Sequence, residues 1–212
     1  SAASSDVESS GRAPVALSAL GAQEDAGDLW RFRVRAWADQ AEDGSNFFGV
    51  NSAAEPGFDP LDWPKPPPAP GSWVRVAFVH PEWQERAGEY RRDLRGPGSE
   101  GETWEIEVRS STPGEAITLE LSEVVPAGSE LALRLLDLEQ GSAVDWLRRP
   151  GDSPQSAGTE PAADRSVLQY RMVSFGDRPY RLSIVAGTGD YVAHGGQQQL
   201  AHPFAPAQVG LG

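Results

Sequence analysis

The stretch LWRFRVRAWA, residues 29–38, decides the fold class, because its apolar and charged residues alternate. One face of an extended chain here carries Trp30, Phe32, Val34 and Ala36, and the other face carries Arg31, Arg33 and Arg35. Successive side chains of a β-strand point to opposite faces of its sheet. The pattern therefore predicts a strand that is buried on one face and solvated on the other.

A second stretch, TWEIEVRS (residues 103–110), alternates in the same way. Its polar face holds Glu105, Glu107 and Arg109. Glutamates on one strand and arginines on its neighbour stabilise a sheet when they lie opposite each other. Pairing between this face and the arginines of residues 29–38 is the simplest explanation for both charged faces.

Seven further segments have strand character, and turn sequences such as TPGE, PAGS, EQGS and FGDRP separate several of them. These segments are residues 73–79, 90–95, 116–122, 130–137, 143–148, 166–174 and 180–186. Many short strands joined by tight turns, with little helical periodicity, predict an all-β fold. We predict an antiparallel β-sandwich, Ig-like or jelly-roll-like, over residues 29–187.

The stretch from Asp43 to Trp73 interrupts this pattern and is predicted to be a long loop rich in proline and aromatic residues. Its large apolar side chains are Phe47, Phe48, Phe58, Trp63 and Trp73. They can fold back to plug an open end of the sandwich, or they can form an interface with a neighbouring subunit. A third possibility is a platform for glycans formed by Trp63, Trp73 and Trp83.

The two ends of the chain are predicted to be extensions, residues 1–28 and residues 188–212. Residues 13–20, APVALSAL, place Val15 and Leu17 at strand spacing and form a candidate donor strand. Such a segment either completes its own sheet or inserts into the open sheet edge of a neighbour. The small, polar start SAASSDVESSGR suggests an exported chain after processing.

Composition excludes several classes of function. The formal net charge of -13 argues against nucleic acid as a partner, because phosphate binding requires a basic face. The absence of cysteine excludes disulfides and thiolate chemistry. No segment has the length of a membrane-spanning helix.

We find no catalytic motif, and we predict that the protein is not an enzyme. The three histidines, His80, His194 and His202, lack partners at a diagnostic spacing. Glu105 and Glu107 lie about 6–7 Å apart along one strand face, a separation near that of glycosidase carboxylates. Arg109 shares that face, so a structural role for the pair is the simpler interpretation.

A calcium site is the only cofactor that the sequence suggests. Hard oxygen ligands gather between residues 39 and 62, and Ca²⁺ binds six to eight such oxygens. The candidate ligands are Asp39, Asp43, Asn46, Asp59 and Asp62. The alternative is that these side chains stabilise turns by accepting hydrogen bonds from their own backbone.

The order of these features resembles the β-sandwich modules of large exported bacterial surface proteins, which precede FlgD-like or C-terminal sorting domains. The resemblance covers roughly residues 30–186 and rests on NFFGV, AEPGFD, PPAP and DLR in that order. HPFAP, residues 202–206, is similar to the N-P-F-x-P opening of those sorting segments, with His202 in place of asparagine.

The resemblance implies export to the cell surface or the extracellular space. The strand-like terminal segments, the long aromatic and proline-rich loop and the lack of a catalytic motif lead us to expect a non-enzymatic structural subunit of a bacterial filament or surface polymer, assembled through contacts between strands and loops. The alternative is a carbohydrate-binding or adhesive module of a larger surface protein.

Overall fold

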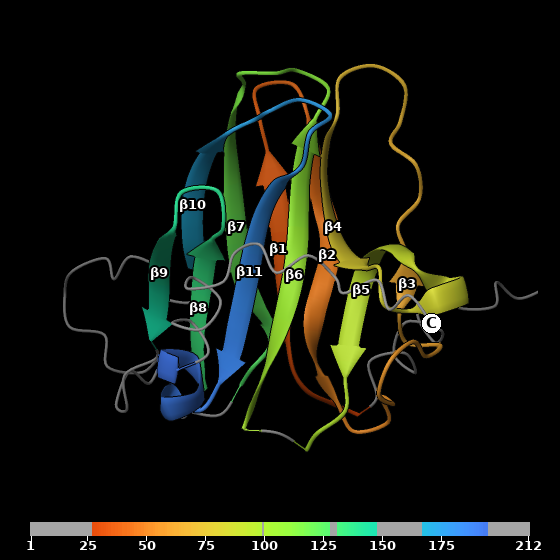
Figure 1. Cartoon of the computed structure of the whole chain (residues 1–212), viewed down its shortest axis with the longest axis vertical. Coiled ribbons are helices and arrows are strands. Elements are labelled where there is room, and N and C mark those ends of the chain that lie inside the picture. The colour runs from red at the N-terminus through yellow and green to blue at the C-terminus, as the bar shows by residue number, and fades with distance from the viewer. Residues whose placement is uncertain (1–26, 99, 128–130, 148–166, 195–212) are drawn as a thin grey trace, which may run out of the picture.

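The computed structural model of the protein describes residues 27–98, 100–127, 131–147 and 167–194, and Figure 1 shows their arrangement. These residues form eleven β-strands, a single 3-10 turn and a short helix over residues 189–194. No helix among them is long and apolar enough to cross a membrane. The predicted all-β fold class is therefore confirmed.

The strands and the 3-10 turn are, in chain order, β1 (Asp28–Trp37), β2 (Glu42–Asn51), β3 (Trp63–Pro64), β4 (Val74–His80), η1 (Gln84–Arg86), β5 (Gly88–Arg95), β6 (Gly101–Ser110), β7 (Ala116–Val125), β8 (Ala132–Asp137), β9 (Ser142–Leu147), β10 (Val167–Val173) and β11 (Tyr180–Gly187). Each segment predicted from the sequence contains one strand, and β2 and β3 are additional. The alternation of apolar residues therefore located the strands well.

The strands pair in the order β10-β7-β1-β2-β5-β4-β6-β11-β8-β9, and β3 pairs with β5 outside this path. All of these pairs are antiparallel except β2 and β5, which run parallel with Phe47 opposite Arg92. The prediction of a purely antiparallel fold is wrong at this pair. The long connection over residues 52–73 lets β4 run opposite to β2, so β5, which turns back from β4, runs in the same direction as β2.

Pairing is continuous along this path, and the strands form one curled sheet whose two flanks face each other (Figure 1). Trp104 on β6 contacts Trp30 on β1 and Phe48 on β2, although these strands are not neighbours in the sheet. The apolar side chains inside the curl therefore share one core. The predicted sandwich, which would have two separately paired sheets, is not confirmed.

β1 buries the face that its sequence predicts. Phe32, Val34 and Ala36 are fully buried in the core. On the opposite face the guanidinium of Arg35 forms a bidentate pair with Glu42 on β2, at 2.7 and 2.8 Å. The expected pairing with Glu105 and Glu107 is wrong, because β1 lies between β2 and β7 whereas β6 lies between β4 and β11.

β2 is the main correction to the sequence analysis, since the predicted loop over residues 43–73 begins with a strand. Phe48 on β2 is fully buried, and Asn46 is buried as well. The Asn46 side-chain amide donates a hydrogen bond to the backbone carbonyl of Val34, 3.2 Å away, which satisfies a polar group inside the sheet. Gly44, Asn46 and Gly49 interrupt the apolar alternation and made the strand look like a loop.

Gly49 allows β1 and β2 to approach closely. A Cβ atom added to Gly49 would lie 2.3 Å from the carbonyl oxygen of Trp30 and 2.9 Å from the Cα atom of Arg31. Both of these atoms belong to the backbone, so neither can rotate away. The glycine therefore fixes how β1 packs beside β2.

Replacing Gly49 with alanine is expected to lower the free energy of unfolding by about 1–3 kcal/mol, as overpacking does elsewhere. Gly88→Ala on β5 is the matched control, because the nearest atom to its added Cβ is 3.9 Å away. That control should change stability by less than about 0.5 kcal/mol. Urea unfolding of both variants measures the difference, and equal losses would contradict the close approach.

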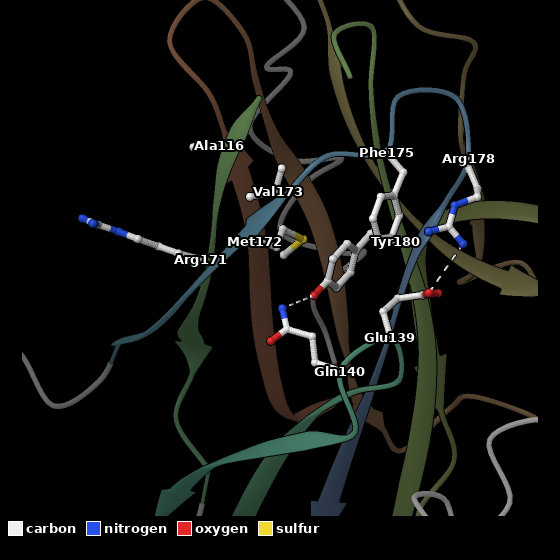
Figure 2. A pocket seen from close by; sticks show the side chains of 9 residues that line it. All are labelled: Ala116, Glu139, Gln140, Arg171, Met172, Val173, Phe175, Arg178 and Tyr180. Atoms are coloured by element: carbon white, nitrogen blue, oxygen red, sulfur yellow. Dashed lines mark hydrogen bonds and ion pairs between the residues drawn. The ribbon is translucent and has the colours of Figure 1, made fainter. Parts of the chain in front are cut away.

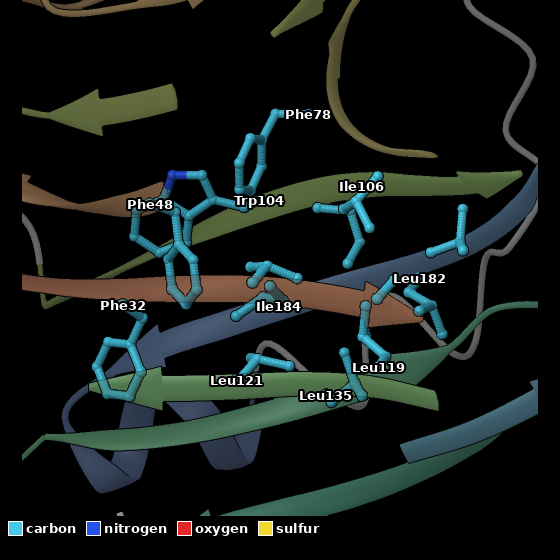
Figure 3. Packing of buried hydrophobic residues seen from close by; sticks show 14 of the residues in the cluster. Phe32, Phe48, Phe78, Trp104, Ile106, Leu119, Leu121, Leu135, Leu182 and Ile184 are labelled. Carbon is cyan, nitrogen blue, oxygen red and sulfur yellow. The ribbon is translucent and has the colours of Figure 1, made fainter. Parts of the chain in front are cut away.

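The core inside the curl combines aromatic and aliphatic side chains from both flanks (Figure 3). Trp104 lies at its aromatic end, where its ring centroid is 5.0 Å from that of Phe48. Phe32 and Phe48 stack on each other with their rings 19° from parallel. The aliphatic end holds Leu119, Leu135 and Leu182, among others.

A second, smaller cluster lies on the other face of β8 and β11. Leu136 and Val185 pack there against Val192, which belongs to the helix over residues 189–194. The start of the predicted C-terminal extension is therefore packed against the sheet. The rest of that extension and the predicted N-terminal extension, with its candidate donor strand, lie outside the described residues apart from Gly27 and Asp28.

Candidate functional site

Among the described residues, a seam lies between β10, at one end of the strand path, and the β8–β9 turn near the other end, and no strand pairing closes the curled sheet there. Within the part of the chain that the structure describes, β10 pairs only with β7 and β9 pairs only with β8. The hydroxyl of Tyr170 on β10 nevertheless donates a hydrogen bond to the carboxylate of Asp137 at the end of β8. A side-chain hydrogen bond thus connects β10 to β8 across the gap, but the backbone of β10 pairs with neither β8 nor β9.

A pocket of about 460 Å³ lies at this seam (Figure 2). The residues that line it come from β10, the β8–β9 turn, the β10–β11 turn and the first residues of β7 and β11: Ala116, Glu139, Gln140, Arg171, Met172, Val173, Phe175, Arg178 and Tyr180. We call it the seam pocket. It falls within the volume range of ordinary ligand pockets.

The seam pocket is apolar at its centre and charged at its rim. Val173 and Phe175 are 54% and 38% exposed, although both are large apolar residues. The ring of Phe175 stacks on Tyr180 at a centroid distance of 5.2 Å, and the guanidinium of Arg178 lies 3.7 Å from the Phe175 centroid. Arg171 points away from the pocket centre (Figure 2). The geometry favours a partner that brings apolar side chains.

The β8–β9 turn forms one wall of the seam pocket, and Asp137 shapes it. The Asp137 carboxylate accepts hydrogen bonds from the backbone N–H groups of Glu139 and Gln140, both at 2.8 Å. Gly141 completes the turn with a φ of 66°, a conformation that glycine adopts without strain. An aspartate followed by a glycine four residues later therefore sets this hairpin.

The same carboxylate also organises two tyrosines beneath the pocket. The hydroxyls of Tyr170 and Tyr180 both donate to Asp137, which is 1% exposed. Burial raises the pKa of both tyrosines, and the hydrogen bonds to the Asp137 carboxylate raise each pKa further. Both hydroxyls therefore remain protonated donors at neutral pH. They hold the seam from inside.

The β10–β11 turn forms the opposite wall of the pocket. Phe175 and Arg178 form an isolated β-bridge, and Gly176 between them has a φ of 78°. The Gly176 N–H donates to the hydroxyl of Ser174 at 2.9 Å, and the N–H of Gly114 donates to the Ser174 carbonyl at 2.8 Å. These bonds fix the exposed Phe175 at the pocket. The sequence FGDRP predicts this turn but not the site, because only the fold shows that β10 has a single strand neighbour among the described residues.

The predicted calcium ligands do not form one group. Asp43 and Asn46 hold the ammonium of Lys65, whose side chain is 7% exposed, so a lysine already occupies the space between these two residues. Asp43 also accepts the backbone N–H of Val76 on β4, at 2.8 Å. Burial lowers the pKa of Lys65, and its attraction to Asp43 opposes that effect. The cluster connects β2, β4 and the residue after β3.

Asp59 and Asp62 lie elsewhere and bind backbone groups. Asp59 accepts hydrogen bonds from the N–H groups of Glu55 and Leu61, at 2.7 and 2.6 Å. Asp62 accepts those of Asp59 and Leu94, at 3.0 and 3.1 Å. Both aspartates therefore stabilise the loop backbone, which is the alternative to calcium binding that the sequence left open.

The fifth predicted ligand, Asp39, is exposed in the β1–β2 turn. Among the described residues, no group of three or more histidine, aspartate or glutamate side chains is arranged to hold a metal ion. The structure thus separates the five predicted ligands into a lysine-bound pair, two backbone-bound aspartates and one solvent-exposed side chain.

Asp62 belongs to a buried ionisable cluster that the sequence did not predict. Asp93, 1% exposed, binds the ring Nε2 of His80 at 2.8 Å and the guanidinium of Arg95 at 3.4 Å. Burial is the largest influence on the pKa of Asp93, but His80 and Arg95 outweigh it, so the pKa of Asp93 is lowered. Burial raises the pKa of Asp62 to about 7, and the nearby charge of Asp93 adds to that shift.

Both ring nitrogens of His80 are engaged, since Nδ1 lies 2.7 Å from the carboxylate of Glu82. The Trp83 ring stacks on the His80 ring at 3.6 Å and covers it. Burial acts to lower the pKa of His80, but the two carboxylates outweigh it and the pKa is raised. This arrangement stabilises a charged pair at the end of β4 and leaves His80 no free nitrogen for acid–base chemistry.

The three tryptophans of the predicted glycan platform have separate surroundings. Trp63 lies 4.6 Å from the guanidinium of Arg92 and 4.9 Å from that of Arg91, so cation–π contacts engage its ring. Trp83 packs on His80, Phe58 and Tyr90. Trp73 is half-buried just before β4. Within the described ranges, none of the three stacks on another.

The residues of the predicted interface are also separated. Phe48 is in the core, whereas Phe47 lies half-buried on the other face of β2, with Arg31 5.4 Å from its ring centroid. Phe58 contacts Trp83. Val15 and Leu17 lie outside the described residues. The surface that protrudes beside β3 and β4 is the proline run, residues 66–70, which is exposed (Figure 1).

Glu105 and Glu107 do not have the same surroundings. Glu107 pairs with Arg109, whose guanidinium also lies 3.0 Å from Glu89 on β5. Glu105 is exposed on β6. Arg109 therefore neutralises one member of the pair, as its position on the same strand face predicts.

Comparison with known proteins adds no relative to this description. No family model matches the chain, and neither a curated protein nor a solved structure matches it significantly.

Proposed function

We propose that this chain is a non-enzymatic structural subunit of an extracellular bacterial filament or surface polymer, assembled by strand exchange between copies. The observation that carries the proposal is the second edge of β10, which pairs with no other described strand and lies beside the apolar seam pocket. An unpaired edge strand is a template for a strand from another chain. Exposed apolar side chains at its end provide sites for the side chains of that strand.

The surroundings of the buried ionisable groups support a structural role. His80 is held through both ring nitrogens, and Lys65 is held between Asp43 and Asn46. Asp62 binds two backbone N–H groups. Each of these groups connects elements of the fold and is not directed into the seam pocket, so they stabilise the subunit.

Strand exchange provides a simple route to a polymer. A subunit with a donor segment at one place and an acceptor edge at another makes a head-to-tail contact, and such contacts form fibres when the rotation does not close a ring. Residues 13–20 are the candidate donor, with Val15 and Leu17 as its apolar side chains. The exposed proline run over residues 66–70 is stiff and offers a further packing surface that loses little entropy on docking.

Negative-stain electron microscopy of the full chain tests this proposal. The unmodified protein is expected to form regular filaments, whereas the double variant Val15→Asp, Leu17→Asp should remain as single particles. Charged residues at donor positions would have to enter an apolar site, which is strongly unfavourable. The matched control, Ser9→Asp with Ser10→Asp, adds the same charge outside the donor segment and should assemble normally. Single particles of the unmodified protein under all assembly conditions would refute the polymer.

A further inference from the structure

We propose that the second edge of β10, the one opposite β7, is the acceptor for residues 13–20 of a second copy of this chain, and that Val15 and Leu17 of that copy contact the seam pocket. This inference rests on the proposed function, because it identifies the contact that joins one subunit to the next. It names one surface of the described fold as the acceptor, and this surface can be tested separately from the existence of the polymer.

The backbone of β10 is suited to accept a strand. All seven residues from Val167 to Val173 pair with β7 in regular register, without a bulge. In an antiparallel ladder, alternate N–H and C=O groups point to the opposite edge, where a further strand can pair. Natural edge strands are often protected by bulges, proline or lysine. β10 has no bulge, proline or lysine, and Arg171 is its one charged side chain. Its length is close to that of the eight-residue candidate donor.

The side chains at the end of β10 leave apolar surface for a donor to cover. Val173 and Phe175 are 54% and 38% exposed, whereas Met172, next to Val173 on β10, is buried. The fold holds them in place, because the Phe175–Arg178 bridge and the Gly176–Ser174 hydrogen bond fix the turn. A strand with apolar residues at every second position would shield them from water, which is the main driving force for such a contact.

Charge also favours this segment as the occupant. Arg178 lies at the rim of the seam pocket, and its guanidinium is 3.6 Å from the carboxylate of Glu139, which also lines the pocket. Residues 13–20 contain no charged side chain, so the segment can enter an apolar site without burying a charge. Arg12 directly precedes it, and acidic residues lie farther out on both sides, at Asp6, Glu8, Glu24 and Asp25.

Disulfide trapping between copies tests the acceptor, since the chain contains no cysteine of its own. One partner carries Val173→Cys, and the other carries a single cysteine at one position from 14 to 18. The two are mixed, assembled and mildly oxidised. We expect disulfide-linked pairs of different copies, with yields that alternate at every second position, because only side chains on the same face of adjacent strands meet. Asp39→Cys, in the exposed β1–β2 turn, replaces Val173→Cys in the control and should give no alternation.

A second variant tests the same surface without cysteines. Val173→Lys places an ammonium in the seam pocket and is expected to raise the protein concentration needed for assembly by about tenfold or more. Gln40→Lys is the matched control, because Gln40 is exposed in the β1–β2 turn and lies outside both β10 and the seam pocket. It makes the same charge change and should assemble like the unmodified protein, and both variants should keep their unfolding temperature.

Each outcome decides between the acceptor and the polymer. Filaments without cross-copy disulfides at any position, together with normal assembly of Val173→Lys, would overturn the β10 acceptor and leave the polymer in place. A variant that carries both cysteines in one chain completes the test. If disulfides form only within that single chain, residues 13–20 complete their own sheet, which overturns strand exchange between copies. The absence of both filaments and disulfides would refute the proposed function itself.

Discussion

Replacing Phe48 with alanine is expected to lower the free energy of unfolding by about 3–5 kcal/mol, the usual loss for a large aromatic side chain in a core. Phe48 is fully buried and contacts the rings of Phe32, Trp104 and Phe78 from three different strands. Its removal therefore leaves a cavity between the two flanks of the curled sheet. Urea unfolding followed by tryptophan fluorescence measures the loss.

Phe47→Ala is the matched control, because the two phenylalanines are neighbours on β2 but point to opposite faces. Phe47 is half-buried beside Arg31 and loses mainly a cation–π contact, which costs about 1 kcal/mol or less. The large difference between adjacent positions would establish β2 as a strand in the core. A similar small loss for both variants would instead support the loop that the sequence predicted.

Asp62 is expected to make stability depend on pH in the neutral range. Its pKa is about 7 in the folded protein and about 4 in the unfolded chain, so the folded state binds this proton more tightly. That contribution is complete below about pH 4 and is lost as the pH rises to about 7. From pH 5 to pH 8 this contribution to the free energy of unfolding decreases by about 2–3 kcal/mol.

The variant Asp62→Asn cannot ionise and should lose this component of the pH dependence. The free energy of unfolding of the unmodified protein, minus that of the variant, is expected to fall by about 2–3 kcal/mol from pH 5 to pH 8. Asparagine cannot accept both backbone hydrogen bonds, so the variant should be less stable at pH 5 by about 1–3 kcal/mol. Thermal or urea unfolding at several pH values provides the comparison.

Other ionisable groups lie around Asp62. Asp59 lies in the same loop, Asp93 and Tyr90 lie on β5, and His80 lies on β4 against Asp93. The raised pKa of His80 gives stability that is complete below about pH 6.5 and is lost as the pH rises through its folded-state pKa. His80 is present in both proteins, so its own contribution largely cancels in the difference.

Asp39→Asn makes the same substitution at an exposed carboxylate outside this cluster and is the matched control. If the difference between the unmodified protein and Asp62→Asn stays constant from pH 5 to pH 8, Asp62 is ionised throughout this range. The burial of its carboxylate would then be less complete than the structure shows.

The sequence predicted the strands well because most of them have one apolar face. In β1, Phe32, Val34 and Ala36 alternate with arginines, and this local signal needs no knowledge of the neighbours. β2 carries no such signal, since buried Asn46 is polar and Gly49 has no side chain. Its place in the sheet depends on a hydrogen bond to Val34 and on close backbone contact with Trp30, which only the folded structure provides.

The neighbours of each strand were harder to predict. Arg35 pairs with Glu42 on β2 and not with Glu107 on β6, because strand order is set by the long-range pairing of the curled sheet. The separation of the candidate calcium ligands was hidden for a related reason. Lys65 follows Asp43 by 22 residues, and nothing local shows that its ammonium enters the space between Asp43 and Asn46.

The seam pocket could not be predicted, because it depends on which strands end the sheet. Val173 and Phe175 look like ordinary alternating residues of a strand and its turn. They become a candidate site only because β10 has one strand neighbour among the described residues and lies beside the β8–β9 turn. The turn residues Asp137 and Gly176 were visible in the sequence, but their position at one seam was not.

The position of β1 in the strand path affects how the protein is made. β1 is the first of the described strands to leave the ribosome, yet its second neighbour is β7, with Arg31 opposite Val125 and Trp37 opposite Thr118. At translation rates of about 5–20 residues per second, β7 follows roughly 5–20 s later. During this time the nascent chain has Phe32, Val34 and Ala36 in a strand with an open edge. Before its release, the nascent chain therefore passes through a stage that requires protection from aggregation, as folds dominated by distant contacts generally do.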